Sequence, residues 1–254
     1  MSRPTRLGPN LASLGNGLVG VGAIAYTFLG NKLIALLLIV VGTAFDSLDG
    51  FLARRSRLPP SSFGRFADSA ADAVTFGIAP AVMVAFHSWN VNLWSPYSVA
   101  TIAVAALVAV LAVARLTYFT IRGFQRPFFL GVPSPIMALT VVVLVLMADE
   151  PPFLGTMPEL FLVAAGVAAV MMVVPLRYPK IRRGSVLRLP MAGTMAALSL
   201  AVVAVQFASV PDAPGFLVGF AASAVGAAGL FIYYLLGPMA VTRERLRPDA
   251  QVHA

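Results

Sequence analysis

Four aspartates occur within a short stretch of this chain at a spacing suited to binding a metal ion. Asp46 and Asp49 are three residues apart, and Asp68 and Asp72 are four residues apart. If both stretches are helical, each pair lies on one helix face. Carboxylate oxygens are the ligands that hard divalent cations prefer. The spacing predicts one or two cations between two acidic faces; the alternative is a salt-bridge network with the four arginines at positions 54 to 65.

Small residues accompany the acidic faces. Gly50, Ala53 and Gly64 share those faces with the aspartates. They leave room for a large substrate to approach the backbone, or they serve only to let helices pack closely. Pro59-Pro60 lies between the two acidic stretches and predicts a turn. Two antiparallel helices would then direct both acidic faces to one place.

The composition excludes a water-soluble globule. The chain is 59% hydrophobic and 11% charged, with a mean hydropathy of +0.88, whereas soluble domains are about 25% charged. At about 20 apolar residues for each membrane crossing, a chain of 254 residues has room for about eight helices. Because it has no cysteine, disulfides and thiolate chemistry are excluded, and any metal must be bound by oxygen ligands.

The elements that must position the aspartates are therefore membrane helices. We expect an all-α integral membrane protein, a polytopic bundle of about eight transmembrane helices. Breaker residues such as Gly30-Asn31 and Pro238 separate or end the apolar segments. The predicted segments are residues 10–28, 33–54, 64–89, 96–122, 133–148, 158–178, 185–210 and 215–238.

The basic residues are distributed unevenly over the predicted connections. Seventeen of the 18 lysines and arginines fall on the side that carries both termini, and only Lys32 falls on the other. By the positive-inside rule, both termini and the acidic stretches are expected to be cytoplasmic in a cell-membrane protein. This asymmetry explains the net charge of +8, so no nucleic-acid partner is expected.

The order of the acidic and small residues resembles a known signature. Asp46 is followed by two residues, Asp49-Gly50, two residues, Ala53-Arg54, nine residues, Gly64, three residues, Asp68, three residues and Asp72. This string is similar to the signature of the CDP-alcohol phosphatidyltransferase family. The resemblance implies a membrane enzyme, often a homodimer, that moves a phosphatidyl group from a CDP-linked lipid to an alcohol. It also implies release of CMP and the use of Mg2+ or Mn2+.

Further stretches resemble the phosphatidylserine synthase branch of that family. Examples are Phe76-Gly77, Ala79-Pro80-Ala81, the string from Phe129 to Pro135, and Arg177-Tyr178. The resemblance implies CDP-diacylglycerol as donor, L-serine as acceptor and phosphatidylserine as product. It runs to about position 180. We therefore expect a catalytic helical bundle over residues 1–180, and two additional transmembrane helices with a cytoplasmic tail over 181–254.

The resemblance also assigns roles to single residues. Asp46, Asp49 and Asp68 would bind the cation. Asp72 would act as general base on the acceptor hydroxyl and also touch the metal. The expected substrate-binding residues are Gly50, Ala53, Arg54, Gly64, Arg65 and Arg115.

The three arginines of that set have physical reasons to bind substrate. Arg54 and Arg65 border the aspartates and suit a phosphate group. Arg115 lies in an apolar segment, where a charge is costly without a role. The carboxylate of a serine acceptor is a suitable ligand for it. The alternative is that the Arg115 side chain only extends to the membrane interface.

Two other functions stay open at this point. The acceptor can differ, because Tyr118 and Thr120 stand where the branch often has an arginine and an asparagine. Glycerol phosphate, inositol phosphate or another alcohol would then replace serine. The second alternative is a transporter in which the acidic cluster binds a coupling cation. The half-length repeats typical of transporters are not seen in the apolar pattern.

Overall fold

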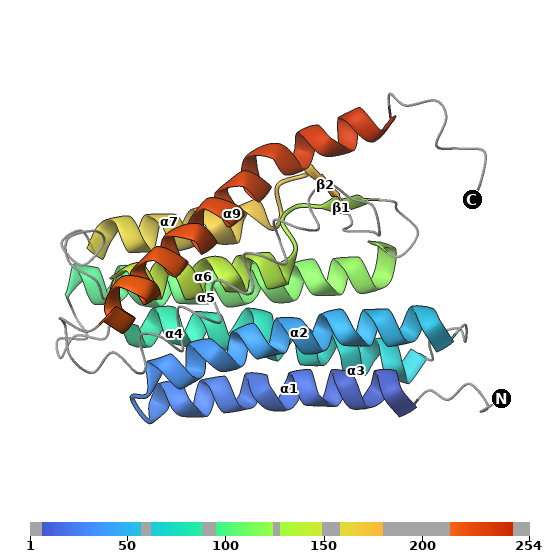
Figure 1. Cartoon of the computed structure of the whole chain (residues 1–254), viewed down its shortest axis with the longest axis horizontal. Helices are drawn as coiled ribbons and strands as arrows, with labels where there is room; N and C mark the ends of the chain where they lie inside the picture. Colours follow the sequence, from blue (N-terminus) through green and yellow to red (C-terminus); the bar gives the residue numbers. More distant parts are fainter. Residues whose placement is uncertain are drawn as a thin grey trace.

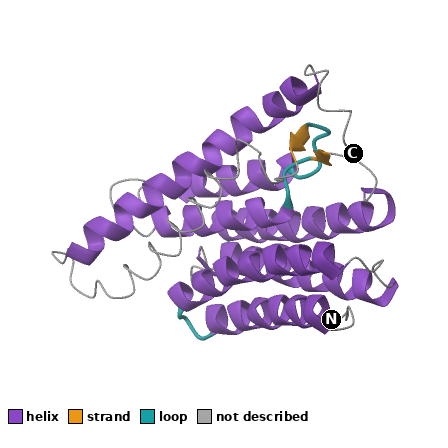
Figure 2. Ribbon diagram, turned by 45° about the vertical axis from the view of Figure 1, so that its right-hand side comes forward, coloured by secondary structure: helices purple, strands orange, loops and turns teal. Residues whose placement is uncertain are grey.

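The structure, a computed structural model, describes residues 7–56, 62–87, 95–123, 128–148, 158–179 and 214–245. Nearly all of these residues are helical (Figure 2). Two segments, η1 and η2, are π-helical. The elements are α1 (Leu7–Phe28), α2 (Lys32–Ser56), α3 (Ser62–Ala73), η1 (Val74–Ile78), α4 (Ala79–His87), α5 (Pro96–Tyr118), η2 (Phe119–Gly123), β1 (Phe128–Leu130), α6 (Ser134–Ala148), α7 (Pro158–Met171), β2 (Arg177–Pro179) and α9 (Pro214–Arg245).

The helices α1 and α2 form an antiparallel pair joined by the predicted break at Gly30-Asn31. Gly30 has a φ of 77°, a left-handed conformation that glycine adopts without steric cost at the end of a helix. The Asn31 side-chain oxygen accepts a hydrogen bond from the backbone N–H of Ile34 at 3.2 Å. This is an N-cap for α2. The turn therefore returns α2 alongside α1.

The third apolar segment is a continuous helical stretch with a π-helical turn in its middle. It runs through α3, η1 and α4, and the Ala79 N–H donates to the Val74 carbonyl. Thr75 lies in this turn, is buried, and donates its hydroxyl to the Asn16 carbonyl on α1 at 2.7 Å. Such π turns often occur at functional sites. This one begins two residues after Asp72 and was not predicted from the sequence.

The two short strands form a small antiparallel ribbon that the sequence pattern did not predict. Phe129 pairs with Tyr178, and Leu130 pairs with Arg177. Gly131 follows with a φ of 72°, and its N–H donates to the Leu176 carbonyl at 2.8 Å. A side chain at Gly131 would collide with the Met172 carbonyl oxygen. The ribbon thereby joins the start of α6 to the end of α7.

Helix α6 is the central element. It contacts α2, α4, α5, α7 and α9, and Met137, Leu139 and Val142 on it are almost completely buried. Figure 1 shows α1 to α4 on one side of α5 and α6, with α7 and α9 on the other. The described ends of α1 at Leu7 and α9 at Arg245 lie at the end of the bundle where α2 ends and α3 begins (Figure 1).

Five described stretches are long and apolar enough to cross a membrane, which indicates a multi-pass membrane protein. They are Leu11–Phe28, Lys32–Leu52, Gly64–Phe86, Pro96–Ile121 and Ala221–Met239. Two other predicted segments are shorter apolar helices, Ser134–Ala148 and Glu159–Met171. The predicted segment 185–210 lies outside the described residues.

The last predicted segment, 215–238, ends close to the end of the apolar span Ala221–Met239, but Pro238 does not end the helix as predicted. Helix α9 continues through Pro238 and ends at Arg245. A proline is tolerated inside a membrane helix because neighbouring groups can satisfy the backbone carbonyl that it leaves without a donor.

Candidate active site

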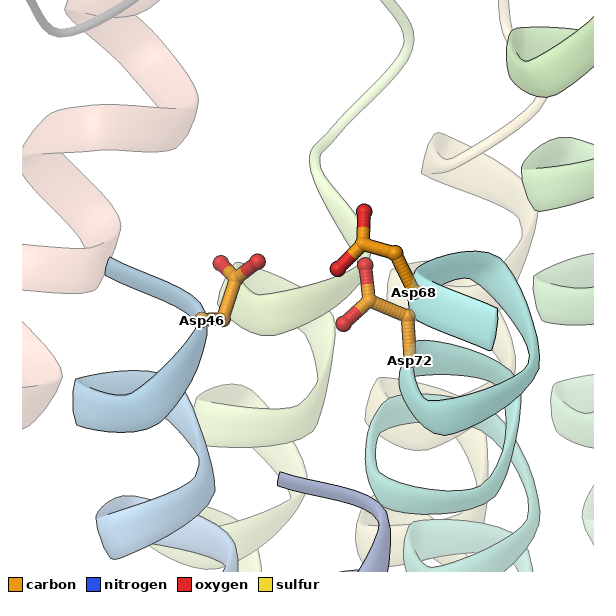
Figure 3. A group of neighbouring side chains, drawn as sticks. All are labelled: Asp46, Asp68 and Asp72. Atoms are coloured by element: carbon orange, nitrogen blue, oxygen red, sulfur yellow. The ribbon is translucent and has the colours of Figure 1, made fainter. Parts of the chain in front are cut away.

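Three of the four predicted aspartates form one group. Asp46 on α2 faces Asp68 and Asp72, which lie one turn apart on α3 (Figure 3). One carboxylate oxygen from each lies within 4.8 Å of the others, and all three side chains are partly buried. Oxygen ligands of a single hard cation, at metal–oxygen distances of about 2.1–2.5 Å, lie at most about 4–5 Å apart. The donor set therefore fits one divalent ion.

The charges of this group also favour a cation. Two unit charges about 4 Å apart repel by about 4 kcal/mol at an effective dielectric constant of about 20. Three ionised carboxylates at such distances require compensation by a cation or by protons. The close approach of the three carboxylates is therefore better explained by a metal site than by an acidic surface without a cation.

Asp49 belongs to the same site but is directed toward α1. Its side chain is 8% exposed, and its Oδ2 accepts a hydrogen bond from the Ser13 hydroxyl at 2.7 Å. The same hydroxyl lies 3.4 Å from Asp68 Oδ1. Ser13 thus links the aspartate that stands outside the three-carboxylate group to one inside it.

Asn16, also on α1, contacts the proposed general base. It is fully buried, and its Nδ2 donates to Asp72 Oδ1 at 2.8 Å. Within the described residues, the Asn16 Oδ1 has no hydrogen-bond partner. The sequence analysis did not identify Ser13 or Asn16. The feature that could have identified them is their spacing: they are two polar residues three positions apart in an apolar helix, and hence lie on one helix face.

The contact of α1 with the acidic helices depends on glycine. A Cβ at Gly42 of α2 would meet the Thr75 Cγ2 and would lie 3.1 Å from Asn16 Oδ1. A Cβ at Gly20 of α1 would lie 2.8 Å from the Thr75 Cα. Side chains at either position would push α1, α2 and η1 apart. The missing side chains therefore allow Ser13 and Asn16 to reach the aspartates.

The other predicted substrate residues lie near the aspartates in the sequence and differ in exposure where the structure describes them. Gly50 follows Asp49, Gly64 lies one turn before Asp68, and both are half-buried. Arg65 is exposed. The side chains of Ala53 and Arg54 lie outside the described part of the structure.

Arg115 is buried and does not extend to the surface. Its side chain is 8% exposed, and its Nη1 donates to the Ser134 hydroxyl at 3.2 Å. The guanidinium carbon lies 5.9 Å from the centre of the Phe129 ring. The Arg115 Nε has no hydrogen-bond partner among the described residues, so one buried donor is available to a ligand.

Comparison with known proteins identifies a family and several named relatives. The family model for CDP-alcohol phosphatidyltransferase matches residues 6–174. A CDP-diacylglycerol–serine O-phosphatidyltransferase of Helicobacter pylori is 33% identical over 184 residues, which cover 71% of this chain and 75% of the relative. An archaetidylserine synthase of Methanothermobacter thermautotrophicus is 29% identical over 68% of this chain and 70% of its own length. A CDP-diacylglycerol–serine O-phosphatidyltransferase of Bacillus subtilis is 32% identical over 54% of this chain and 73% of its own length.

Proposed function

Because the chain belongs to the CDP-alcohol phosphatidyltransferase family, we propose that it makes phosphatidylserine. It transfers the phosphatidyl group of CDP-diacylglycerol to the hydroxyl of L-serine and releases CMP. The reaction class is supported by the three carboxylates with oxygens within 4.8 Å of one another, the observation that carries this proposal. The serine acceptor is supported by the names of the relatives.

Asp46, Asp68 and Asp72, with Asp49 beside them, would hold one or two Mg2+ or Mn2+ ions. A bound divalent ion neutralises the pyrophosphate of the donor and so stabilises the charge that develops on the CMP leaving group. The carboxylate-only donor set favours such hard cations. Gly50, Ala53 and Gly64 would leave room for the CDP moiety, and Arg54 and Arg65 would bind its phosphates.

Asp72 would act as the general base. It takes the proton of the serine hydroxyl while the hydroxyl oxygen forms a bond to the phosphatidyl phosphorus. The bond from that phosphorus to the CMP oxygen breaks, and CMP leaves with the bonding electrons. The Asn16 amide, 2.8 Å from Asp72 Oδ1, fixes the direction of this carboxylate. Positioning of the reactants and charge stabilisation then supply most of the catalysis.

Arg115 would bind the carboxylate of serine. The side chain is buried and has a free Nε donor among the described residues. A guanidinium is well suited to a carboxylate because of its planar arrangement of donors. A serine held by Arg115 would present its hydroxyl toward the base. Acceptors with a phosphate, such as glycerol phosphate, also carry an anion, so they are the main alternative.

We place the enzyme in the cell membrane with its active site and both termini on the cytoplasmic side. The support is the one-sided distribution of arginine and lysine. We further propose about eight spans, a catalytic bundle over residues 1–180, two additional helices over 181–254, and a homodimer as implied by the family. The transporter alternative is disfavoured because the chain belongs to a family of transferases.

An acceptor panel tests the proposed function. The purified protein is incubated with CDP-diacylglycerol, Mn2+ or Mg2+, and L-serine, glycerol 3-phosphate or inositol phosphate, and CMP release is measured. We expect CMP release with L-serine that Asp72→Asn lowers strongly. CMP release with glycerol 3-phosphate but not with serine would refute serine as the acceptor and would leave the proposed phosphatidyl transfer standing. If Asp72→Asn abolished solute flux in liposomes without changing CMP release, the general-base assignment would be wrong.

A further inference from the structure

The buried guanidinium of Arg115 has two neighbours that come from one short stretch of the chain. Its Nη1 donates to the Ser134 hydroxyl at 3.2 Å, and its carbon lies 5.9 Å from the centre of the Phe129 ring. Phe129 lies in β1, Ser134 is the first residue of α6, and the turn at Gly131 lies between them. Neither Phe129 nor Ser134 belongs to the acidic group or to the substrate residues expected from the sequence.

The backbone around Ser134 is held in place on both sides. The Val132 N–H donates to the Met171 carbonyl of α7 at 2.9 Å. Pro133 and Pro135 flank Ser134, and each proline ring fixes its own φ. The Ser134 side chain is only 1% exposed. The position of its hydroxyl is therefore set by the fold of the chain and needs no substrate.

The Phe129 ring is held between the ribbon and the helix that carries Arg115. Phe129 is directly opposite Tyr178 in the ribbon, so the two side chains project from the same face. The centre of the Phe129 ring lies 5.6 Å from that of Phe119, whose backbone N–H donates to the Arg115 carbonyl. A cation within about 6 Å of a ring centre is attracted to the ring. The ring therefore restricts the movement of the guanidinium.

The charge at this place is not balanced by its two neighbours. The Ser134 hydroxyl is a neutral acceptor, and the N-terminus of the 15-residue helix α6, which begins at Ser134, carries a partial positive charge of its own. Within the part of the chain that the structure describes, Nε of Arg115 donates to no acceptor. A buried donor without an acceptor is costly. An anionic group that accepts from Nε would satisfy this donor and balance both positive charges.

We propose that Ser134 and Phe129 are positioning residues: they hold the Arg115 guanidinium so that its Nε–H donates to the anionic group of the acceptor. This inference rests on the proposed function, in which that group is the carboxylate of L-serine. A guanidinium that is already fixed loses little conformational entropy when the acceptor binds, which increases the affinity. The stretch from β1 to the start of α6 thereby acquires a function in acceptor binding.

Two buried serines in the first turns of different helices provide a matched comparison. Ser134→Ala removes the hydroxyl that accepts from Arg115. Ser98→Ala removes a buried hydroxyl at the far end of α5, which accepts from the Ser95 hydroxyl at 2.9 Å. We expect Ser134→Ala to raise the KM for L-serine by about tenfold, the usual effect of losing a hydrogen bond to a charged group. The kcat and the KM for CDP-diacylglycerol should change little, and Ser98→Ala should leave all three values near those of the wild type.

Phe129→Leu tests the other contact and does not depend on the folding of Ser134→Ala. It keeps an apolar side chain in the ribbon and removes the ring beside the guanidinium. We expect the KM for L-serine to rise by about fivefold, as for the loss of a partly desolvated cation–π contact. Melting temperatures in detergent identify any variant that does not fold. If Ser134→Ala does not fold, the result for Phe129→Leu decides.

A double-mutant cycle separates an effect through Arg115 from a general loss of packing. In an Arg115→Met background, Ser134→Ala should lower kcat/KM for serine little further, because the group that it positions is absent. The inference is refuted if Ser134→Ala and Phe129→Leu both leave the serine KM within about twofold of the wild type. It is also refuted if the KM for CDP-diacylglycerol rises equally, or if the effects of Ser134→Ala and Arg115→Met simply add.

The wild type and Arg115→Met test the proposed function separately. If the wild type uses glycerol 3-phosphate and not serine, the serine assignment is wrong. The KM comparison is then made with glycerol 3-phosphate, whose phosphate is the anion, and an unchanged KM in both variants refutes the inference. If Arg115→Met leaves the serine KM unchanged, Arg115 does not bind the acceptor; the inference is then wrong, while serine as the acceptor stands.

Discussion

Replacing Asn16 with alanine removes a contact to the proposed base without touching an aspartate. The Asn16 Nδ2 lies 2.8 Å from Asp72 Oδ1, and the Asn16 side chain is fully buried. A hydrogen bond to a charged group contributes about 1.5–3 kcal/mol. If it orients Asp72 in the transition state, its loss should lower kcat by roughly 10- to 100-fold. The KM for CDP-diacylglycerol should change less, because Asp46, Asp49 and Asp68 are retained.

The assay is CMP release at saturating serine over a range of CDP-diacylglycerol concentrations. Thr27→Val is the matched control, since Thr27 is also buried on α1 and its hydroxyl donates to the Ala23 carbonyl of the same helix. It removes one buried hydrogen bond at the far end of α1 from the site. We expect kcat of Thr27→Val to stay near the wild-type value. A parallel melting experiment in detergent detects any general destabilisation.

The reasoning predicts that Asn16 acts through Asp72. In an Asp72→Asn background, Asn16→Ala should therefore cost little additional activity. Equal losses from Asn16→Ala with and without the Asp72 carboxylate would refute this. So would a kcat for Asn16→Ala that stays within about twofold of the wild type. In either case the hydrogen bond would serve helix packing alone.

Two further predictions concern the metal and the packing of α1. A chelator should abolish CMP release, and added Mg2+ or Mn2+ should restore it. Asp46→Asn should raise the metal concentration that gives half-maximal CMP release on the order of tenfold or more, because one charged ligand is lost. If the metal titration of Asp46→Asn matched that of the wild type, Asp46 would not be a metal ligand. Gly42→Ala should destabilise the protein by about 1–3 kcal/mol, because its Cβ would meet Thr75 and lie 3.1 Å from Asn16 Oδ1. A Cβ at Gly166 would have no other atom within 4 Å, so Gly166→Ala should have the same melting temperature as the wild type. If Gly42→Ala and Gly166→Ala melted at the same temperature, the packing argument would be contradicted.

The acidic part of the site could be predicted because its residues are costly where they stand. Asp46 and Asp68 occur in stretches otherwise apolar enough to cross a membrane, so their charge requires compensation. The helical spacing then predicted that each pair of aspartates shares a helix face. The turn predicted at Pro59-Pro60 indicated that the second helix runs antiparallel to the first. The structure brings Asp46, Asp68 and Asp72 together. Asp49 differs because the Ser13 hydroxyl holds it toward α1, a contact that no spacing on α2 could reveal.

Residues with weaker signals could not be assigned from the sequence. Placing a serine or an asparagine in a membrane helix costs much less free energy than placing a charged side chain there. Ser13 and Asn16 therefore did not stand out as functional residues in the sequence. The π-helical turn at Val74–Ile78 adds one residue to a helical turn, and the nearby Gly77 and Pro80 do not by themselves specify a π-helical turn. The ribbon pairs Phe129 with Tyr178, residues far apart in the chain, and three-residue strands have no clear periodicity.

The structure gives α1 a role that its apolar composition conceals. The aspartates are supplied by α2 and α3, but the described hydrogen bonds that orient Asp49 and Asp72 come from Ser13 and Asn16 on α1. The Asn16 carbonyl in turn accepts from Thr75 in the π-helical turn. This arrangement requires the close approach that Gly20 and Gly42 permit. Small residues between the helices and polar residues near the aspartates therefore act together, because close packing sets the direction of the carboxylates that we propose to be catalytic.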